Sequence, residues 1–301
     1  MYMRMLVPLD GSKLAENVLP YARVMARALD LRVELVSVVD SMDFARTTHA
    51  GHVRDFDPLI EAATQEGKRY LEGTARSFGG TEVSYAVERG LADQIIIEKA
   101  ARDKGTLIAM ATRGRSGIHR WLMGSVAEKV LRGASNPLLL VRGNEEGRSD
   151  GAATLKSIIV PLDGSKRAET VLPPAMSLAK KLSLEIVLTR AYQIPLSAYA
   201  GADAAYIPNN EGLLTLVREE ASAYLETKVN ELRGNGVEKV SSILMVGSGA
   251  DEIIDLAQGT PDNLIAMCTH GRSGIARWAL GSVTEKVVRH SGDPVLVVRA
   301  E

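Results

Sequence analysis

The sequence predicts an α/β fold of two tandem doubly wound domains, each a five-stranded parallel sheet flanked by helices. Two observations predict it: the chain repeats itself, and within each copy short apolar runs alternate with segments of helical period. Strands that are apolar on both faces are typical of a parallel sheet covered by helices on both sides. A length of 301 residues is enough for two domains of ordinary size.

The repeat is carried by two motifs. VPLDGS at 7–12 returns at 160–165, a displacement of 153 residues. RGRSGIHRWLMGSVAEKVLR at 113–132 returns as HGRSGIARWALGSVTEKVVR at 270–289, a displacement of 157 residues. The second copy therefore contains a net insertion of four residues between the two motifs.

The copies are separated by a segment of linker composition. Residues 143–154 contain Gly, Ser and charged residues with almost no large apolar side chain, which is typical of an exposed connection. We expect one domain at 1–145, a second at 155–301 and a linker at 146–154.

Apolar runs and helical spacing place the elements of each domain. The expected strands are 3–9, 33–39, 83–87, 106–110 and 138–141 in the first copy, and 157–162, 185–191, 240–246, 263–268 and 295–298 in the second. The expected helices of the first copy are 13–29, 58–78, 92–101 and 125–131. Right-handed crossovers then put helices on both faces of each sheet.

Composition restricts the partners. The formal net charge of −1 gives no field that would attract nucleic acid or an anionic membrane, so we expect neither as a partner. The first residues contain neither a signal peptide nor a spanning segment, which favours a cytoplasmic location. The single cysteine, Cys268, cannot form an intrachain disulfide, and this fits a reducing compartment.

The motifs follow the strands at whose carboxyl ends ligands bind in doubly wound sheets. Asp10 and Gly11 follow the first strand, and ATRGRSG at 111–117 follows the fourth and leads to Gly124 and a helix. Closely spaced glycines let backbone N–H groups approach an anion, and the start of a helix adds its free N–H groups. The sequence has no G-x-x-x-x-G-K-[ST] string, which argues against a P-loop ATPase mechanism.

These residues resemble the ATP-binding universal stress proteins, whose pattern is VxxDGS after the first strand and G-x-x-G-x(9)-G-[ST] after the fourth. The resemblance covers essentially the whole chain, twice. The matching residues are Gly114, Gly124 and Ser125 in the first copy and Gly271, Gly281 and Ser282 in the second. Ala111 and Cys268 stand where the pattern has its first glycine, so a side chain there could crowd a phosphate or sugar.

The resemblance implies an adenine nucleotide alpha hydrolase-like fold and a nucleotide-dependent stress-response module that binds ATP with Mg²⁺. It implies that Asp10 and Asp163 contact ribose and that the main chain of Val38 and Ala191 frames adenine. The glycine loops would hold the phosphates. The expected nucleotide-binding residues are Pro8, Asp10, Val38, Gly114, Arg115, Gly117, Gly124, Ser125 and Val126, with Pro161, Asp163, Ala191, Gly271, Arg272, Gly274, Gly281, Ser282 and Val283.

The resemblance also implies an assembly. Similar proteins pair through their last strands, so we expect the two halves to form an intramolecular pseudo-twofold dimer, and two chains can pair again as a homodimer. The edges concerned are 138–141 and 295–298.

Each assignment has a structural alternative. Asp10 and Asp163 can cap the following helices or form the turn in DGS. The Gly-Ser pairs can close a loop and cap a helix, Arg115 and Arg272 can be solvated, and the two tryptophans, Trp121 and Trp278, are expected in packing.

Two further clusters attract a chemical interpretation and favour a structural one. His49, His52, Asp55 and Asp57 have spacing that could hold a metal, but a loop of scattered polar residues accounts for them, and we assign no metal site. Cys268 with His270 suggests a thiol nucleophile, yet a buried inert thiol is favoured. We assign no catalytic residue.

Two other functions stay open. One is a slow ATPase or self-phosphorylating protein, for which the sequence offers a phosphate cradle but no evident general base. The other is a nucleotide-free interaction scaffold of the same fold, since a fold alone does not determine function.

Overall fold

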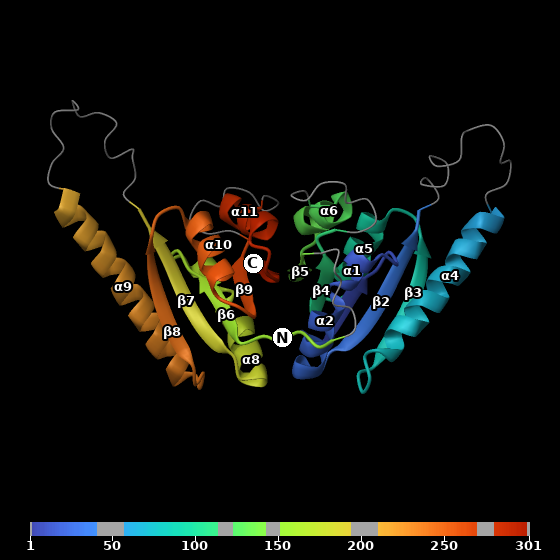
Figure 1. Ribbon diagram of the computed structural model, residues 1–301, viewed down its shortest axis with the longest axis horizontal. Coiled ribbons are helices and arrows are strands. Elements are labelled where there is room, and N and C mark those ends of the chain that lie inside the picture. Colours follow the sequence, from blue (N-terminus) through green and yellow to red (C-terminus); the bar gives the residue numbers. More distant parts are fainter. Residues whose placement is uncertain are drawn as a thin grey trace, which may run out of the picture. The chain divides into compact units, whose positions relative to one another are not determined.

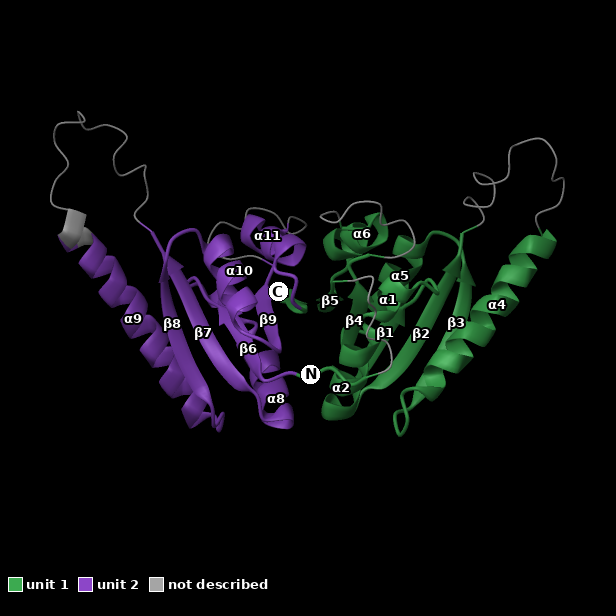
Figure 2. Ribbon diagram, viewed as in Figure 1, with its two compact units in different colours: residues 1–154, 294–299 green, residues 155–293, 300–301 purple. Residues whose placement is uncertain are grey.

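The protein is described here by a computed structural model that covers residues 2–40, 57–113, 123–142, 151–193, 210–269 and 280–299. The chain forms two compact units (Figure 2). Unit 1 consists of residues 1–154 and 294–299, and unit 2 of residues 155–293 and 300–301.

The sheet of unit 1 has five parallel strands in the order β3-β2-β1-β4-β5 (Figure 1). These strands are β1 (Arg4–Pro8), β2 (Arg32–Val39), β3 (Val83–Arg89), β4 (Thr106–Ala111) and β5 (Leu138–Val141). The last strand of the chain, β10 (Val295–Val298), belongs to the same unit and pairs with β5 in antiparallel direction. This is the pairing of last strands that the resemblance implied, while a pseudo-twofold dimer of the two halves stays a prediction.

Unit 2 repeats the arrangement with parallel strands in the order β9-β6-β7-β8. Its strands are β6 (Ser157–Pro161), β7 (Glu185–Tyr192), β8 (Val240–Val246) and β9 (Asn263–Cys268). All ten strands occur where the apolar runs predicted them, to within three residues at each end. The predicted fold class is confirmed.

Helices cover both faces of each sheet, because in unit 1 the chain goes from β1 to β2 and β3 on one side and from β4 to β5 on the other. The helices of unit 1 are α1 (Lys13–Glu16), α2 (Leu19–Leu29), α4 (Asp57–Arg76), α5 (Ala92–Ala101) and α6 (Ser125–Gly133). Those of unit 2 are α7 (Lys166–Glu169), α8 (Leu172–Leu182), α9 (Asn210–Gly234), α10 (Gly249–Gly259) and α11 (Ser282–His290). Among the described helices, none has both the length and the apolar character needed to cross a bilayer.

The expected continuous helix at 13–29 is wrong, because the chain forms α1 and α2 with a break between them. Pro20 lies in the first turn of α2. It has no N–H to donate to the Glu16 carbonyl, and its ring would clash with that carbonyl in a continuous helix. The consequence is a single-turn α1 directly after the DGS motif.

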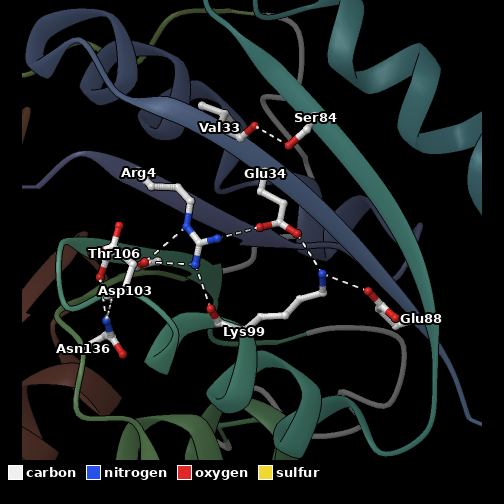
Figure 3. A network of polar contacts seen from close by, with 9 residues as sticks. All are labelled: Arg4, Val33, Glu34, Ser84, Glu88, Lys99, Asp103, Thr106 and Asn136. Atoms are coloured by element: carbon white, nitrogen blue, oxygen red, sulfur yellow. Dashed lines mark hydrogen bonds and ion pairs between the residues drawn. The ribbon is translucent and has the colours of Figure 1, made fainter.

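An ionic network joins the elements of unit 1 on one face of the sheet (Figure 3). Glu34 on β2 accepts from Arg4 Nη1 at 3.1 Å and from Lys99 Nζ at 2.8 Å. Lys99, on α5, also pairs with Glu88 on β3 at 2.8 Å, and its side chain is only 9% exposed. Arg4 Nη2 donates to the Lys99 carbonyl at 2.7 Å and to Thr106 Oγ1 at 3.0 Å. These bonds connect β1, β2, β3, β4 and α5.

Unit 2 has no such charges at the matching places. The four residues that correspond by strand register, or by the displacement of 157 for the helix, are Ser157, Val187, Met245 and Leu256. Three of these side chains, Ser157, Val187 and Met245, are buried. The same fold therefore accommodates either an ionic or a largely apolar layer at this position.

We expect Lys99→Met to destabilise unit 1 by about 3 kcal/mol, because it leaves two carboxylates near each other without their shared cation. Replacing the four charged residues together by the set found in unit 2 (Arg4→Ser, Glu34→Val, Glu88→Met and Lys99→Leu) should cost much less, because no buried charge then remains unpaired. The stability of unit 1 is measured by urea unfolding, followed by Trp121 fluorescence in a chain with Trp278→Phe. An equal loss in both variants would contradict this account.

Asp293 gives unit 2 a pH dependence. Burial raises the pKa of its carboxyl group to about 6, against an opposing hydrogen bond from Asn263. Because the folded state binds a proton at a pH where the unfolded chain has lost it, stability should decrease as pH rises from about 4 to about 6. Unit 1 has Asn136 at the matching position, 157 residues earlier.

We therefore expect Asp293→Asn to stabilise unit 2 at pH 7 by on the order of 1 kcal/mol, a figure reduced for partial solvent exposure. Unfolding curves at pH 4 and pH 7, followed by Trp278 fluorescence in a chain with Trp121→Phe, measure this. The variant should gain stability at pH 7 and change little at pH 4. An equal gain at both values would rule out the carboxyl group as the cause.

Candidate functional site

The candidate site of unit 1 lies at the carboxyl ends of β1 and β4, which are neighbours in the sheet. The chain continues from β1 to β2 on one side and from β4 to β5 on the other. The connections therefore diverge at this point, which is where doubly wound sheets bind ligands. The corresponding place in unit 2 is at the ends of β6 and β9.

The DGS motif of unit 1 forms a compact turn after β1. Asp10 Oδ1 accepts from the Ser12 backbone N–H at 2.9 Å and from Ser12 Oγ at 2.6 Å. Gly11 has φ +77°, a left-handed conformation that favours glycine. Ser12 Oγ in turn accepts from Ala15 N at 3.1 Å and caps α1. Asp10 therefore forms the turn, and the alternative in which it caps the helix is wrong.

Unit 2 has the same turn with nearly the same distances. Asp163 Oδ1 accepts from Ser165 N at 2.9 Å and from Ser165 Oγ at 2.6 Å. Gly164 has φ +83°, and Ser165 Oγ caps α7 by accepting from Ala168 N at 3.2 Å. Each aspartate is thus oriented by its own serine.

The start of α6 is held against the end of β4. Gly124 N donates to the Thr112 carbonyl at 2.8 Å, and Gly124 is the N-cap residue of α6. A Cβ atom at Gly124 would lie 3.3 Å from that carbonyl oxygen and 3.7 Å from Arg113 Cα. This close approach between backbones explains the glycine. Gly281 N donates to the Thr269 carbonyl in the same way, also at 2.8 Å.

Ser125 and Ser282 are the first residues of α6 and α11, so neither is the N-cap. Both are exposed. Among the described residues, no side chain makes a capping bond at either helix start, so the interpretation of these serines as caps is wrong. Val126 and Val283 follow them in the first turn of each helix.

The remaining described residues of the predicted site lie at the same edges. Pro8 ends β1 and pairs with Val36, and Val38 lies two residues further along β2. Leu9 N donates to the Val36 carbonyl at 2.8 Å, which continues the pairing toward the site. Pro161 and Ala191 take the corresponding places on β6 and β7 in unit 2.

Part of the predicted site lies outside the described residues and stays a prediction. This part comprises Gly114, Arg115, Gly117, Gly271, Arg272 and Gly274. His49, His52, Asp55, Trp121, His270 and Trp278 also lie outside. Asp57 begins α4, and within the described ranges no three His, Cys, Asp or Glu side chains come together as ligands for a metal.

Ala111 and Cys268, which replace the first motif glycine, are the last residues of β4 and β9. They are only 7% and 6% exposed. Cys268 Sγ accepts from Thr170 Oγ1, at the end of α7, at 3.5 Å, while its backbone carbonyl accepts from Thr284 Oγ1 on α11 at 2.9 Å. The thiol is therefore packed against the helix that follows β6.

Sequence reasoning missed two arginines beside the site of unit 1. Arg113 follows β4 and Arg142 follows β5, and these two strands are paired. Burial, and then the positive charge of Arg142, lower the pKa of the Arg113 guanidinium. Two cations that influence each other near a helix start form a region that favours anions. The only sign of this positive region in the sequence is that an arginine comes shortly after each of these two strands.

Comparison with known proteins agrees with the repeat. The model of the universal stress protein family matches residues 1–142 and again 154–299. Universal stress protein MJ0531 of Methanocaldococcus jannaschii is 30% identical over 142 residues, covering 47% of this chain and 83% of that protein. Universal stress protein MJ0577 of the same organism is 30% identical over 154 residues, covering 48% of this chain and 94% of that protein.

A solved structure is similar over the full length. The crystal structure of a universal stress protein from Archaeoglobus fulgidus has a TM-score of 0.65 at 20% identity and covers 98% of both chains. At this identity the similarity demonstrates a shared fold and nothing more. With two matches to the family model that together include most of its length, the chain belongs to the universal stress protein family as a tandem two-domain member.

Proposed function

We propose that each unit binds ATP at the carboxyl edge of its sheet, with Mg²⁺ carried by the nucleotide, and that the chain is a nucleotide-dependent stress-response module. One observation carries the proposal: the aspartate turn after β1 and the start of α6, where no described side chain makes a capping bond, adjoin neighbouring strand ends at the divergence point. Unit 2 has both features after β6 and β9.

The start of α6 supports binding of the phosphates. A helix start presents backbone N–H groups and positive potential to an anion. Gly124 leaves no side chain between this helix and Thr112, and Ser125 is exposed in the first turn with a hydroxyl that can donate to a phosphate oxygen. Arg113 and Arg142 add positive charge nearby.

The turn after β1 supports binding of the ribose. The Asp10 carboxylate is oriented by two hydrogen bonds from Ser12, so it needs no rearrangement before accepting from a sugar hydroxyl. Val38 lies on the adjacent strand, two residues beyond the partner of Pro8, and offers main-chain groups to adenine, as the resemblance implies.

The proposal includes a cytoplasmic location and at most weak ATP hydrolysis. Linear formation of ADP with time would instead favour the slow ATPase. Failure to bind any adenine nucleotide would favour the scaffold.

We expect isothermal titration of the nucleotide-free chain with Mg-ATP to give two sites per chain. Ser125→Ala should weaken the unit 1 site about tenfold and Ser282→Ala the unit 2 site by a similar factor, because each removes a donor to a charged ligand. Ser77→Ala, an exposed serine after α4, is the matched control and should change neither site. We avoid Gly124→Ala as a first test, because a Cβ there crowds the Thr112 carbonyl.

The stoichiometry separates the outcomes. Two sites, each weakened by its own serine variant, would support two separate ATP sites. One site would show that either Ala111 or Cys268 is not tolerated in place of glycine. The proposal would be overturned if the titration gave no heat of binding and the purified protein carried no bound nucleotide.

A further inference from the structure

We propose that Tyr70 in unit 1 and Tyr224 in unit 2 are positioning residues that fix the aspartate turns and thereby set the affinity of each nucleotide site. The inference rests on the function proposed above. Neither tyrosine belongs to the sequence motifs, and both lie on the helix that follows the second strand of their unit.

In unit 1 the tyrosine anchors the helix on which the turn depends. Tyr70 Oη, on α4, donates to Glu16 Oε1 on α1 at 3.0 Å. Helix α1 has only four residues, too few for a stable isolated helix, so its position depends on such tertiary bonds. Its N-cap is Ser12, whose hydroxyl bonds Asp10 Oδ1 at 2.6 Å. A short chain of bonds therefore leads from Tyr70 to Asp10.

Unit 2 has the same chain of bonds. Tyr224 Oη donates to Glu169 on α7 at 2.9 Å. Helix α7 also has four residues, with Ser165 as N-cap and Asp163 bonded to the Ser165 hydroxyl at 2.6 Å. The tyrosine and glutamate are 54 residues apart in unit 1 and 55 in unit 2. The repeat thus preserved an interaction between distant parts of each copy.

Both phenols remain donors at physiological pH. Burial, then the charge of Glu16 and more weakly that of Asp10, raise the pKa of Tyr70. Burial and then the hydrogen bond to Glu169 raise the pKa of Tyr224, with Asp163 acting in the same direction.

The two units differ in what else holds the glutamate. In unit 2, Lys228 Nζ donates to Glu169 Oε2 at 2.9 Å and to Glu231 at 2.8 Å. In unit 1, Thr74 occupies the position of Lys228, four residues after the tyrosine, and its hydroxyl donates to the Tyr70 carbonyl instead. Glu169 is therefore tied to α9 by two side chains, and removal of one leaves the other.

Unit 2 also fixes the tyrosine ring itself. The Arg190 guanidinium lies 5.0 Å from the centre of the Tyr224 ring and makes two bonds to Glu220, at 3.2 and 2.8 Å. The Arg190 side chain is 5% exposed. Ser37 is the matching residue of β2 in unit 1. The unit 1 turn should accordingly be the more sensitive to loss of its tyrosine hydroxyl.

We expect Tyr70→Phe to weaken Mg-ATP binding at the unit 1 site about tenfold, and Tyr224→Phe to weaken the unit 2 site about threefold or less. Each titration is made in the full-length chain with the other site weakened, so that one heat signal dominates. Tyr70→Phe is combined with Ser282→Ala, and Tyr224→Phe with Ser125→Ala. Tyr85→Phe is the matched control, since Tyr85 is 42% exposed on β3. Its affinity should equal that of the parent chain.

A second readout needs no nucleotide. Amide hydrogen exchange of residues 11–16 should accelerate in Tyr70→Phe, whereas exchange of residues 164–169 should change less in Tyr224→Phe. Adding Thr74→Lys to Tyr70→Phe installs the second tie found in unit 2 and should restore much of both the affinity and the protection. Lys228→Thr added to Tyr224→Phe should bring the loss at unit 2 closer to that of Tyr70→Phe at unit 1.

The outcomes are distinguishable. If the parent chain binds Mg-ATP and Tyr70→Phe binds equally well, the positioning role is overturned while the proposed function stands. If Tyr70→Phe only lowers the melting temperature, with unchanged affinity and turn exchange, the role is likewise overturned. If the parent chain binds no nucleotide, the proposed function fails and this role fails with it. If Tyr70→Phe does not fold, a comparison of Tyr224→Phe with and without Lys228→Thr tests the same role in unit 2.

Discussion

The position of β1 between two parallel neighbours is the constraint on which unit 1 depends. β1 is hydrogen-bonded to β2 on one side and to β4 on the other, so both of its edges are paired. The chain goes from β1 to β2 on one side and from β4 to β5 on the other, so right-handed crossovers place helices on both faces and the connections diverge at the carboxyl ends of β1 and β4. The burial of the core, the place of the turn and the approach of α6 to β4 all follow from this arrangement.

The two copies stabilise the same sheet with different chemistry. Unit 1 joins four strands and a helix through the charged side chains around Lys99, while unit 2 places largely apolar side chains at the matching positions. Buried ion pairs cost desolvation that their attraction repays only with good geometry, so an apolar replacement of similar volume is a viable alternative. The two copies therefore share their strand pairing and the polar residues of the site, whereas the side chains at the positions around Lys99 differ.

The turns at the two sites combine a local and a distant interaction. Locally, each aspartate and serine form a bonded turn that needs only three consecutive residues and a glycine with positive φ. At a distance, Tyr70 and Tyr224 hold the single-turn helices on which those turns depend. Units that share a motif can therefore differ in how firmly they hold it, because Lys228 has no counterpart of the same charge at Thr74.

The repeat and the ten strands could be predicted from the chain alone, because apolar period, glycine and proline act over a few residues. Even the break before α2 was encoded by Pro20, although the helical spacing around it obscured that signal. The bond between Tyr70 and Glu16, the network around Lys99 and the antiparallel direction in which β10 pairs with β5 could be known only from the tertiary structure. These join residues far apart in the chain, and their partners depend on how each crossover passes over the sheet and on the direction in which the last strand returns.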